Sequence, residues 1–416
     1  MAMAKRSGRG RTQTARKKIK FEHRLVLANW MLDLFEATSL EDLARGMKDS
    51  DFEGLTDNNI TRFHQILTLR LFERSELSND ILLAYDQNIV KHWKQITEKR
   101  NRKEGRQLNL KYFQYLCLLF TEVYLDRYFR NSEKLLADLN KYTVRFNAGE
   151  TRQQPSLGSL FATGLSDDAQ IAPFTEGDLK KLAFWSATGS GKTLLMHVNI
   201  MQYRHYLKLH GRQSELNRII LLTPNEGLSI QHRDEFFLSG MFADLFDKES
   251  SRLFTSQQIE IIDIHKLKET AGDKTVAIDA FEGNNLVLVD EGHRGASGAE
   301  VGHWMQMRNR LCDKGFSFEY SATFGQAMKA SGNKDLEHEY AKCILFDYSY
   351  KYFYGDGYGK EYRILNLEDD SNEEHRKRYL TACLLAFYQQ KKLYREKKLD
   401  LGRFLIEEPL WIFVGG

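Results

Sequence analysis

The chain has 416 residues, of which 42% are hydrophobic and 28% are charged, and its net charge is +3. This composition is that of an ordinary globular protein and excludes a disordered or fibrous chain. No apolar run approaches the length of about 18 residues that a membrane-spanning helix needs. We therefore expect two or three folded domains and no membrane partner.

Four cysteines, Cys117, Cys312, Cys343 and Cys383, are scattered and lack the close spacing of a zinc site. No apolar secretory segment follows the basic N-terminus. Disulfides rarely persist in the cytosol, so reduced thiols are the expected state there. We therefore expect a cytoplasmic protein with free thiols.

Positive charge is concentrated at the N-terminus. Residues 1–20 hold eight Lys and Arg residues and no acid, so they carry +8, and the rest of the chain, from a total of +3, carries −5. Such a tail either contacts the phosphate backbone of a nucleic acid or is simply solvated. Both interpretations stay open, and we predict a basic disordered tail over 1–20.

The next segment, residues 21–146, has the period of amphipathic helices. Apolar residues recur near every third or fourth position, beginning with Leu25, Trp30 and Phe35. The pattern predicts an all-helical domain whose aromatic residues form its core. Further apolar helical stretches are 60–72, 81–93 and 108–129.

Two stretches are expected to be connections. The charged cluster 99–106 is predicted to be a solvated link between helices. Residues 147–180 are richer in Gly, Ser, Gln and Asp, and they contain Pro155 and Pro173. This composition predicts a linker into the next domain.

From residue 181 to 346, short apolar strands alternate with helical patterns. This alternation predicts an α/β domain with a parallel sheet that is covered on both faces. In such sheets ligands bind at the carboxyl ends of the strands. The expected strands are 182–185, 218–223, 259–264, 286–289 and 316–320, and the expected helices are 194–209, 227–242 and 301–311.

Between the first strand and the helix after it lies a glycine-rich loop, Ala187-Thr188-Gly189-Ser190-Gly191-Lys192-Thr193. Gly189 and Gly191 allow backbone angles that a side chain disfavours, so successive N–H groups can form an anion site at the helix N-terminus. Lys192 is placed to reach nucleotide phosphates, and the Thr193 hydroxyl is a ligand for Mg²⁺. The general phosphate-loop pattern has Gly at the position of Ser186, so this chain departs from it there.

Two further strand ends carry polar residues. The fourth strand runs into Asp290-Glu291, where Asp290 would hold Mg²⁺ together with Thr193. Glu291 is placed to orient and deprotonate an attacking water. Phosphoryl transfer needs mainly positioning and charge neutralisation, which a lysine, a metal ion and a base supply. The fifth strand ends in Ser321-Ala322-Thr323, a weak signal by itself.

Taken in order, these motifs resemble those of superfamily 2 helicases of the DEAD/DEAH-box type. Residues 187–193 look like motif I, which tolerates a residue other than glycine at Ser186. Thr223-Pro224 resembles motif Ia, Asp290-Glu291-Gly292-His293 motif II, and Ser321-Ala322-Thr323 motif III. The form of motif II, followed by Arg294-Gly295, is most similar to the restriction subunit of type III restriction enzymes. The resemblance covers roughly residues 155–416.

The resemblance implies a RecA-like ATPase domain over 181–346, with ATP and Mg²⁺ as cofactors. The implied catalytic residues are Glu291, Lys192 and His293. Metal binding is implied for Thr193 and Asp290. His293, Ser321 and Thr323 are implied to couple the nucleotide state to movement. Thr223 and Pro224 would lie near a nucleic-acid backbone. The implied nucleotide-binding residues are Ala187, Thr188, Gly189, Ser190, Gly191, Lys192, Thr193, Ser321 and Thr323.

Beyond this domain we expect an aromatic hairpin and a connecting helix over 347–405. Tyr348, Tyr350, Tyr352 and Tyr354 alternate with other residues, which favours a packed hairpin over a platform for stacking bases. An amphipathic helix is expected over 373–398. Residues 406–416 read as the first strand of a truncated second RecA-like domain, whose arginines the family would need to complete its ATP site.

The leading functional hypothesis is an ATP-driven motor on double-stranded DNA within a bacterial restriction or anti-phage defence system. Its partners would be nucleic acid and a methyltransferase or other defence-system subunit. An RNA helicase of the same superfamily and a nucleotide-binding switch that does not translocate remain as alternatives. We expect this sequence by itself to bind nucleotide with little turnover.

Overall fold

The computed structural model describes residues 20–71, 76–153, 170–246, 258–268, 276–277, 281, 283–291, 301–359, 372–402 and 406–412. Of residues 268, 276–277 and 301–306 only the backbone is described. Contacts divide the chain into two compact units, residues 1–359 and 360–416. Apart from Lys20, the predicted basic tail lies outside the described residues.

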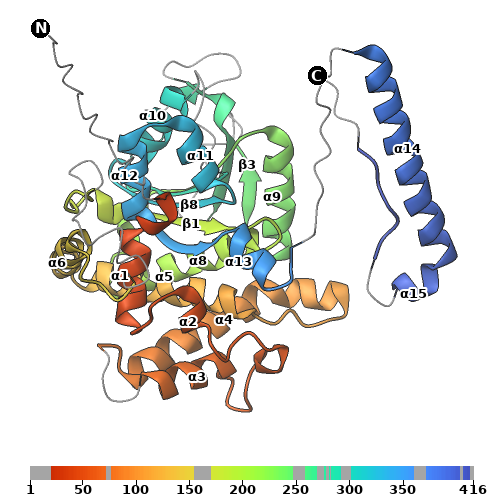
Figure 1. Ribbon diagram of the computed structural model, residues 1–416. Coiled ribbons are helices and arrows are strands. Elements are labelled where there is room, and N and C mark those ends of the chain that lie inside the picture. Colours follow the sequence, from red (N-terminus) through yellow and green to blue (C-terminus); the bar gives the residue numbers. More distant parts are fainter. Residues whose placement is uncertain are drawn as a thin grey trace, which may run out of the picture. The chain divides into compact units, whose positions relative to one another are not determined.

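The first unit is built around a seven-stranded parallel sheet with the strand order β3-β4-β2-β7-β8-β1-β9. This confirms the predicted α/β class, and Figure 1 shows the sheet with helices on both sides. Each of the five predicted strands is present. The strands are β1 Lys181–Ser186, β2 Ile219–Thr223, β3 Ala243–Leu245, β4 Ile259–Asp263, β7 Leu286–Asp290, β8 Phe316–Ser321 and β9 Ile344–Tyr348. A separate pair joins β5 Leu267–Lys268 to β6 Val276–Ala277.

Both faces of the sheet are buried, which is why the central strands β2 and β7 are apolar without alternation. Ile219 and Leu221 of β2 belong to the cluster that contains α8 and α5. Their neighbours Ile220 and Leu222 pack on the opposite face with Leu311 of α10. The helices of this α/β part are α8 Lys192–Leu209, α9 Glu226–Leu238, α10 Val301–Cys312, α11 Phe324–Ser331 and α12 Lys334–Cys343.

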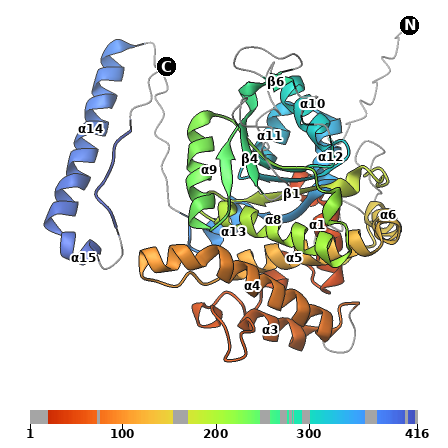
Figure 2. The same cartoon turned by 180° about the vertical axis from the view of Figure 1, so that it is seen from behind.

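The helical segment forms as predicted, but it shares its core with the sheet. Helix α5 is buried around most of its circumference, because it packs on α4 and α6 and also on α8 and β9. Figures 1 and 2 both show α5 alongside α8. Aromatic residues of α5 lie in the same cluster as Phe184 of β1 and Phe318 of β8. The helices are α1 Val26–Leu34, α2 Leu40–Leu43, α3 Arg62–Arg70, α4 Asn79–Glu104, α5 Tyr112–Arg130 and α6 Ser132–Ala148.

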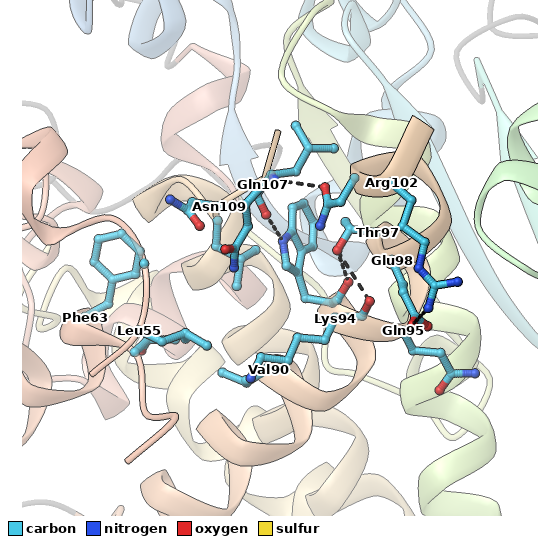
Figure 3. Close-up of a pocket in the computed structure, with 16 residues that line it drawn as sticks. Leu55, Phe63, Val90, Lys94, Gln95, Thr97, Glu98, Arg102, Gln107 and Asn109 are labelled. Carbon is cyan, nitrogen blue, oxygen red and sulfur yellow. Dashed lines mark hydrogen bonds and ion pairs between the residues drawn. The ribbon is translucent and has the colours of Figure 1, made fainter. Parts of the chain in front are cut away.

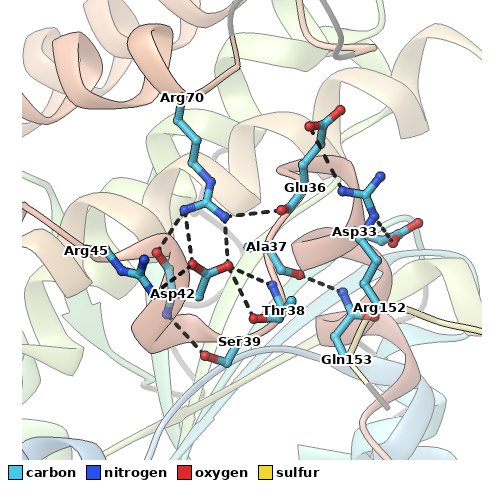
Figure 4. Close-up of polar contacts among 10 residues, drawn as sticks. All are labelled: Asp33, Glu36, Ala37, Thr38, Ser39, Asp42, Arg45, Arg70, Arg152 and Gln153. Atoms are coloured by element: carbon cyan, nitrogen blue, oxygen red, sulfur yellow. Dashed lines mark hydrogen bonds and ion pairs between the residues drawn. The ribbon is translucent and has the colours of Figure 1, made fainter. Parts of the chain in front are cut away.

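A guanidinium–carboxylate pair connects α3 to α2 (Figure 4). Arg70 Nη2 donates to Asp42 Oδ2 at 2.8 Å and to the Glu36 carbonyl at 3.1 Å. The hydrogen bond from Arg70 lowers the pKa of Asp42 to about 2. The carboxylate also accepts from the Thr38 N–H at 3.0 Å. The Asp42 carboxylate therefore accepts hydrogen bonds from several donors and fixes the loop that precedes α2.

The charged cluster 99–106 is largely exposed, as expected, but only its last two residues belong to the connection between helices. Helix α4 continues through Glu104, and its last turns pack on α9. Lys99 Nζ donates to the Phe237 carbonyl at 3.1 Å, and the Arg100 guanidinium is hydrogen bonded to Glu235. Charge-rich residues are good helix formers, so a high density of charge does not by itself end a helix.

The aromatic hairpin expected from Tyr348 onward is absent from the described part of this region. Tyr348 ends strand β9, and Tyr350–Gly355 forms a short helix, α13. Alternate tyrosines had suggested a strand, but the tyrosines at 350 and 354 also lie one helical turn apart, with ring centroids separated by 5.9 Å. The short tyrosine pattern is therefore compatible with a strand and with a helix.

In the second unit, α14 Glu373–Glu396 agrees with the predicted amphipathic helix, and α15 Lys398–Gly402 follows it. Residues 406–412 are described without strand structure, so the strand expected over 406–416 does not appear in its described part. Among the described helices of the whole chain, none combines the length and the apolar character needed to cross a membrane.

Candidate nucleotide-binding site

Three of the predicted motifs meet at one edge of the sheet. Strand β8 lies between β7 and β1, and the register pairs Asp290 with Tyr320 and Trp185 with Ser321. Neighbouring strands are about 4.8 Å apart, so the ends of β7 and β1 lie about 10 Å from each other. Because parallel strands end on the same side, this edge collects the phosphate loop, the acid pair and the Ser-Ala-Thr segment.

The phosphate loop has the backbone that an anion site requires. Gly189 and Gly191 have φ values of +88° and +89°, in the left-handed region that favours glycine. The loop is closed by the Ser190 N–H, which donates to the Ala187 carbonyl at 3.1 Å. Helix α8 begins directly after Gly191. The first N–H groups of a helix have no partner within it, so this helix end attracts an anion.

Lys192 and Glu291 approach each other across the edge. The distance between Lys192 Nζ and Glu291 Oε1 is 3.8 Å, and the two side chains are 13% and 26% exposed. Glu291 has a φ of +56°, unusual for a residue with a side chain. Strained backbone of this kind is often found at functional sites. The structure therefore places the predicted phosphate-binding cation and the predicted base together.

Asp290 is held by two donors. His232 Nε2 lies 2.9 Å from Asp290 Oδ2, and the Glu291 N–H donates to Oδ1 at 3.0 Å. Burial alone would raise the pKa of Asp290, but the His232 hydrogen bond and the charges of His232 and Lys192 outweigh it, so the pKa is lowered. The carboxyl is therefore ionised at neutral pH, the state that Mg²⁺ binds.

The residues present fit a nucleotide with a hard divalent cation. The hydroxyls of Ser190 and Thr323 are buried, and neither has a hydrogen-bond partner among the described residues. Buried hydroxyls without partners are costly unless a ligand or water satisfies them. Thr193, in the first turn of α8, and ionised Asp290 supply oxygen ligands of the kind that Mg²⁺ prefers.

Other predicted site residues have different surroundings. Ser321 is buried, and its hydroxyl accepts from the Thr323 N–H at 3.0 Å. His293 lies outside the described residues. Thr223 and Pro224 are buried, and the Thr223 hydroxyl lies 2.6 Å from that of Ser229. The Thr223 side chain is therefore engaged within the protein.

Two residues of this site were not anticipated. His232, on α9, holds Asp290, and Gln114, on α5, donates to the Ser190 carbonyl at 3.0 Å. Neither residue belongs to a recognisable motif, and each lies in a stretch whose sequence reads simply as a helix. Only the packing of α9 and α5 against the sheet brings them to the site.

A cavity of about 510 Å³ lies elsewhere, within the helical segment (Figure 3). Val90, Trp93 and Lys94 of α4 line it together with Leu55 and Leu108. The Trp93 indole N–H donates to the Leu108 carbonyl at 2.8 Å, so the polar end of this ring is already satisfied. None of its lining residues comes from the phosphate loop or the acid pair, so this cavity is separate from the site.

A parallel sheet with a glycine loop after β1 and an acid pair after β7 defines a RecA-like P-loop domain. The family of this domain follows from comparison with known proteins. Residues 163–326 match the family model of the type III restriction enzyme, res subunit, which is consistent with a DEAD/DEAH-box helicase-like domain in this part of the chain. At the level of the family, this match supports an ATP-dependent, helicase-like motor of a restriction system. A search of curated proteins gave no match.

Proposed function

We propose that this chain supplies the nucleotide-binding motor domain of an ATP-dependent DNA helicase or translocase that hydrolyses ATP with Mg²⁺ and serves a bacterial restriction or anti-phage system. The observation that carries the proposal is the 3.8 Å approach of Lys192 Nζ to Glu291 Oε1, beside Asp290 at the end of β7. A cation on a phosphate loop next to two acids supplies the charge neutralisation and the base that phosphoryl transfer needs.

Each residue has a role in this proposal. Backbone N–H groups of residues 187–193 cradle the phosphates, and Lys192 neutralises them. Thr193 and Asp290 would hold Mg²⁺, which would balance further phosphate charge when bound. Glu291 orients and deprotonates the attacking water. Ser321, Thr323 and His293 would transmit the nucleotide state to the rest of the motor.

Duplex DNA is the proposed polymer because restriction systems act on DNA and the matched family belongs to such systems. A methyltransferase or another subunit of the defence system is the proposed protein partner. The first test measures ATP hydrolysis without polymer and with duplex DNA, single-stranded DNA or RNA. Stimulation by duplex DNA supports the proposal. Stimulation by RNA alone indicates an RNA helicase, and nucleotide binding without stimulation by any polymer indicates a switch.

The assignment of the site is tested by two substitutions. Lys192→Ala should weaken binding of a fluorescent ATP analogue at least tenfold, because removal of a charged partner costs about 1.5–3 kcal/mol. Glu291→Gln should retain binding and lower hydrolysis at least a hundredfold, since general-base catalysis contributes roughly 10²- to 10⁴-fold. Lys329→Ala, on the exposed side of α11, is the control and should behave as the unmodified protein. Normal turnover by a folded Glu291→Gln protein would assign the base to another residue.

A further inference from the structure

The phosphate loop is held by a residue of the helical segment. Gln114 lies in the first turn of α5 and is only 9% exposed. Its side-chain amide bridges two elements. Oε1 accepts from the Lys111 N–H at 3.0 Å, and Nε2 donates to the Ser190 carbonyl at 3.0 Å. One amide group therefore connects the N-terminus of α5 to the loop that precedes α8.

The orientation of this amide is determined by its partners. A backbone N–H can only donate and a carbonyl can only accept. Turning the Gln114 amide over would place Oε1 against the Ser190 carbonyl and Nε2 against the Lys111 N–H, so that both hydrogen bonds would be lost. Gln114 is therefore a directed donor to the loop.

This hydrogen bond bears on the anion site through the geometry of the peptide group. The carbonyl of Ser190 and the N–H of Gly191 belong to one planar trans peptide and point in opposite directions. Fixing the carbonyl towards Gln114 turns the Gly191 N–H away from α5. The fit is close, because a Cβ added at Gly191 would lie 2.6 Å from Gln114 Nε2.

The same turn of α5 also supports the start of the loop. The Ala187 N–H donates to the Tyr348 carbonyl at 2.9 Å. The Phe113 ring stacks on the Tyr348 ring, with centroids 4.0 Å apart and an interplanar angle of 7°. The hydroxyls of Tyr348 and Tyr112 both donate to Asp356 Oδ2. Contacts from α5 therefore reach the loop at its beginning, through β9, and at its end, through Gln114.

We propose that Gln114 is a positioning residue for nucleotide binding and that the first turn of α5 sets the conformation of the phosphate loop. This inference rests on the proposed nucleotide-binding function of the loop. It gives the helical segment a role in the ATP site that none of the helicase-like motifs supplies.

The inference is tested with two variants of the full chain. Gln114→Met keeps the length and helix propensity of the side chain and removes both hydrogen bonds. Gln114→Glu keeps the acceptor for the Lys111 N–H and removes the donor to Ser190. We expect the affinity for a fluorescent ADP analogue to fall about fivefold in the first variant. This is the effect of losing one neutral hydrogen bond, and only the bond to Ser190 reaches the loop. A larger fall is expected in the second, because its carboxylate also repels the phosphates.

A readout without nucleotide complements the affinity measurement. In Gln114→Met, amide hydrogen exchange of a peptide covering residues 187–193 should be at least threefold faster than in the unmodified protein. Asn147→Leu is the matched control. The Asn147 amide also pairs with backbone, accepting from the Ile171 N–H and donating to the Ile171 carbonyl, each at 2.9 Å. Its loss should lower the melting temperature without changing ADP affinity or exchange in the loop.

The outcomes separate the two proposals. If the unmodified protein does not bind the ADP analogue, the proposed function fails, and the exchange experiment still decides the role of Gln114. If the unmodified protein binds but both Gln114 variants match it in affinity and in loop exchange, the positioning role is overturned. Equal effects of Gln114→Met and Asn147→Leu on the loop would also overturn it, because they would indicate a general loss of stability.

Discussion

Glu122 is a fully buried carboxyl at the interface of α4, α5 and α8. Burial raises its pKa to about 7, although hydrogen bonds from Tyr206, Asn88 and Gln202 act in the opposite direction. The same side chain in an unfolded chain titrates near pH 4.3. Because the pKa is higher in the folded state, the folded protein binds this proton more tightly than the unfolded chain does. The stability that the bound proton contributes is fully present below about pH 4. It is lost as the pH rises through 7.

We therefore predict that the free energy of unfolding decreases between pH 5 and pH 8 by about 2–3 kcal/mol through this one group. Urea unfolding at several pH values measures the decrease. Glu122→Gln serves as the reference, because it cannot ionise and fills nearly the same volume. The difference between the two proteins isolates Glu122 from other titrating groups. Parallel pH profiles would show that the carboxyl stays ionised inside the protein.

His232 is the side chain that holds the Asp290 carboxylate of the acid pair in place. Its imidazole is 4% exposed and lies 2.9 Å from Asp290 Oδ2. Without it, the nearly buried carboxylate loses a partner, which typically costs about 1–3 kcal/mol. We predict that His232→Ala lowers the free energy of unfolding by this amount and raises the Mg²⁺ concentration required for half-maximal nucleotide binding.

Ser239→Ala is a suitable control for this prediction. The Ser239 hydroxyl lies 2.8 Å from Nδ1 of the neighbouring buried His197, so this variant also removes a buried histidine contact, but one that does not involve Asp290. It should destabilise the fold without changing the Mg²⁺ requirement. An unchanged Mg²⁺ requirement in His232→Ala would mean that Asp290 is oriented without this hydrogen bond.

At the scale of elements, α5 belongs to two layers. One side of it contacts the other helices of the helical segment, and another side contacts α8 and β9. Its sequence, from Tyr112 to Arg130, is apolar around most of the helix, which is the pattern of a helix buried on all sides. The sequence predicted the burial, whereas the identity of the neighbours follows only from the fold.

Truncation of an α5 core residue should therefore destabilise the whole first unit. Leu119 is 0% exposed and belongs to the cluster shared by the helices and the sheet. We predict that Leu119→Ala lowers the free energy of unfolding by about 2–5 kcal/mol. Leu69→Ala, at a position that is 80% exposed on α3, should change it by less than about 0.5 kcal/mol. Similar effects of the two substitutions in denaturant titrations would contradict the central position of α5.

At the scale of the molecule, residues 1–359 form one compact unit. The sequence suggested a helical domain up to 146 and a separate ATPase domain from 181, because the period of the apolar residues changes between them. The structure joins the two segments through a single hydrophobic cluster that extends from Val26 of α1 to Tyr348 of β9. A change of period marks a change of secondary structure, but it does not show whether the apolar faces on its two sides pack against each other.

The local parts of the candidate site follow from the sequence alone. The strand, the glycines at 189 and 191, and the helix that begins with Lys192 are encoded within a few residues, because glycine conformation and helix ends are local properties. The acid pair at Asp290 and Glu291 is equally local, since it directly follows an apolar strand. A parallel sheet then brings the ends of these strands to one edge.

The tertiary structure decided everything that depends on contacts between distant segments. Gln114 lies 76 positions from Ser190, and His232 lies 58 positions from Asp290. A contact between residues so far apart in the chain produces no pattern in the local sequence, because it depends on how the helices pack against the sheet. The tyrosine spacing at 350–355 likewise fitted both a hairpin and a helix, and only the structure shows that this segment is a helix. The sequence thus determined the chemistry of the loop and the acid pair, and the fold determined which residues hold them in place.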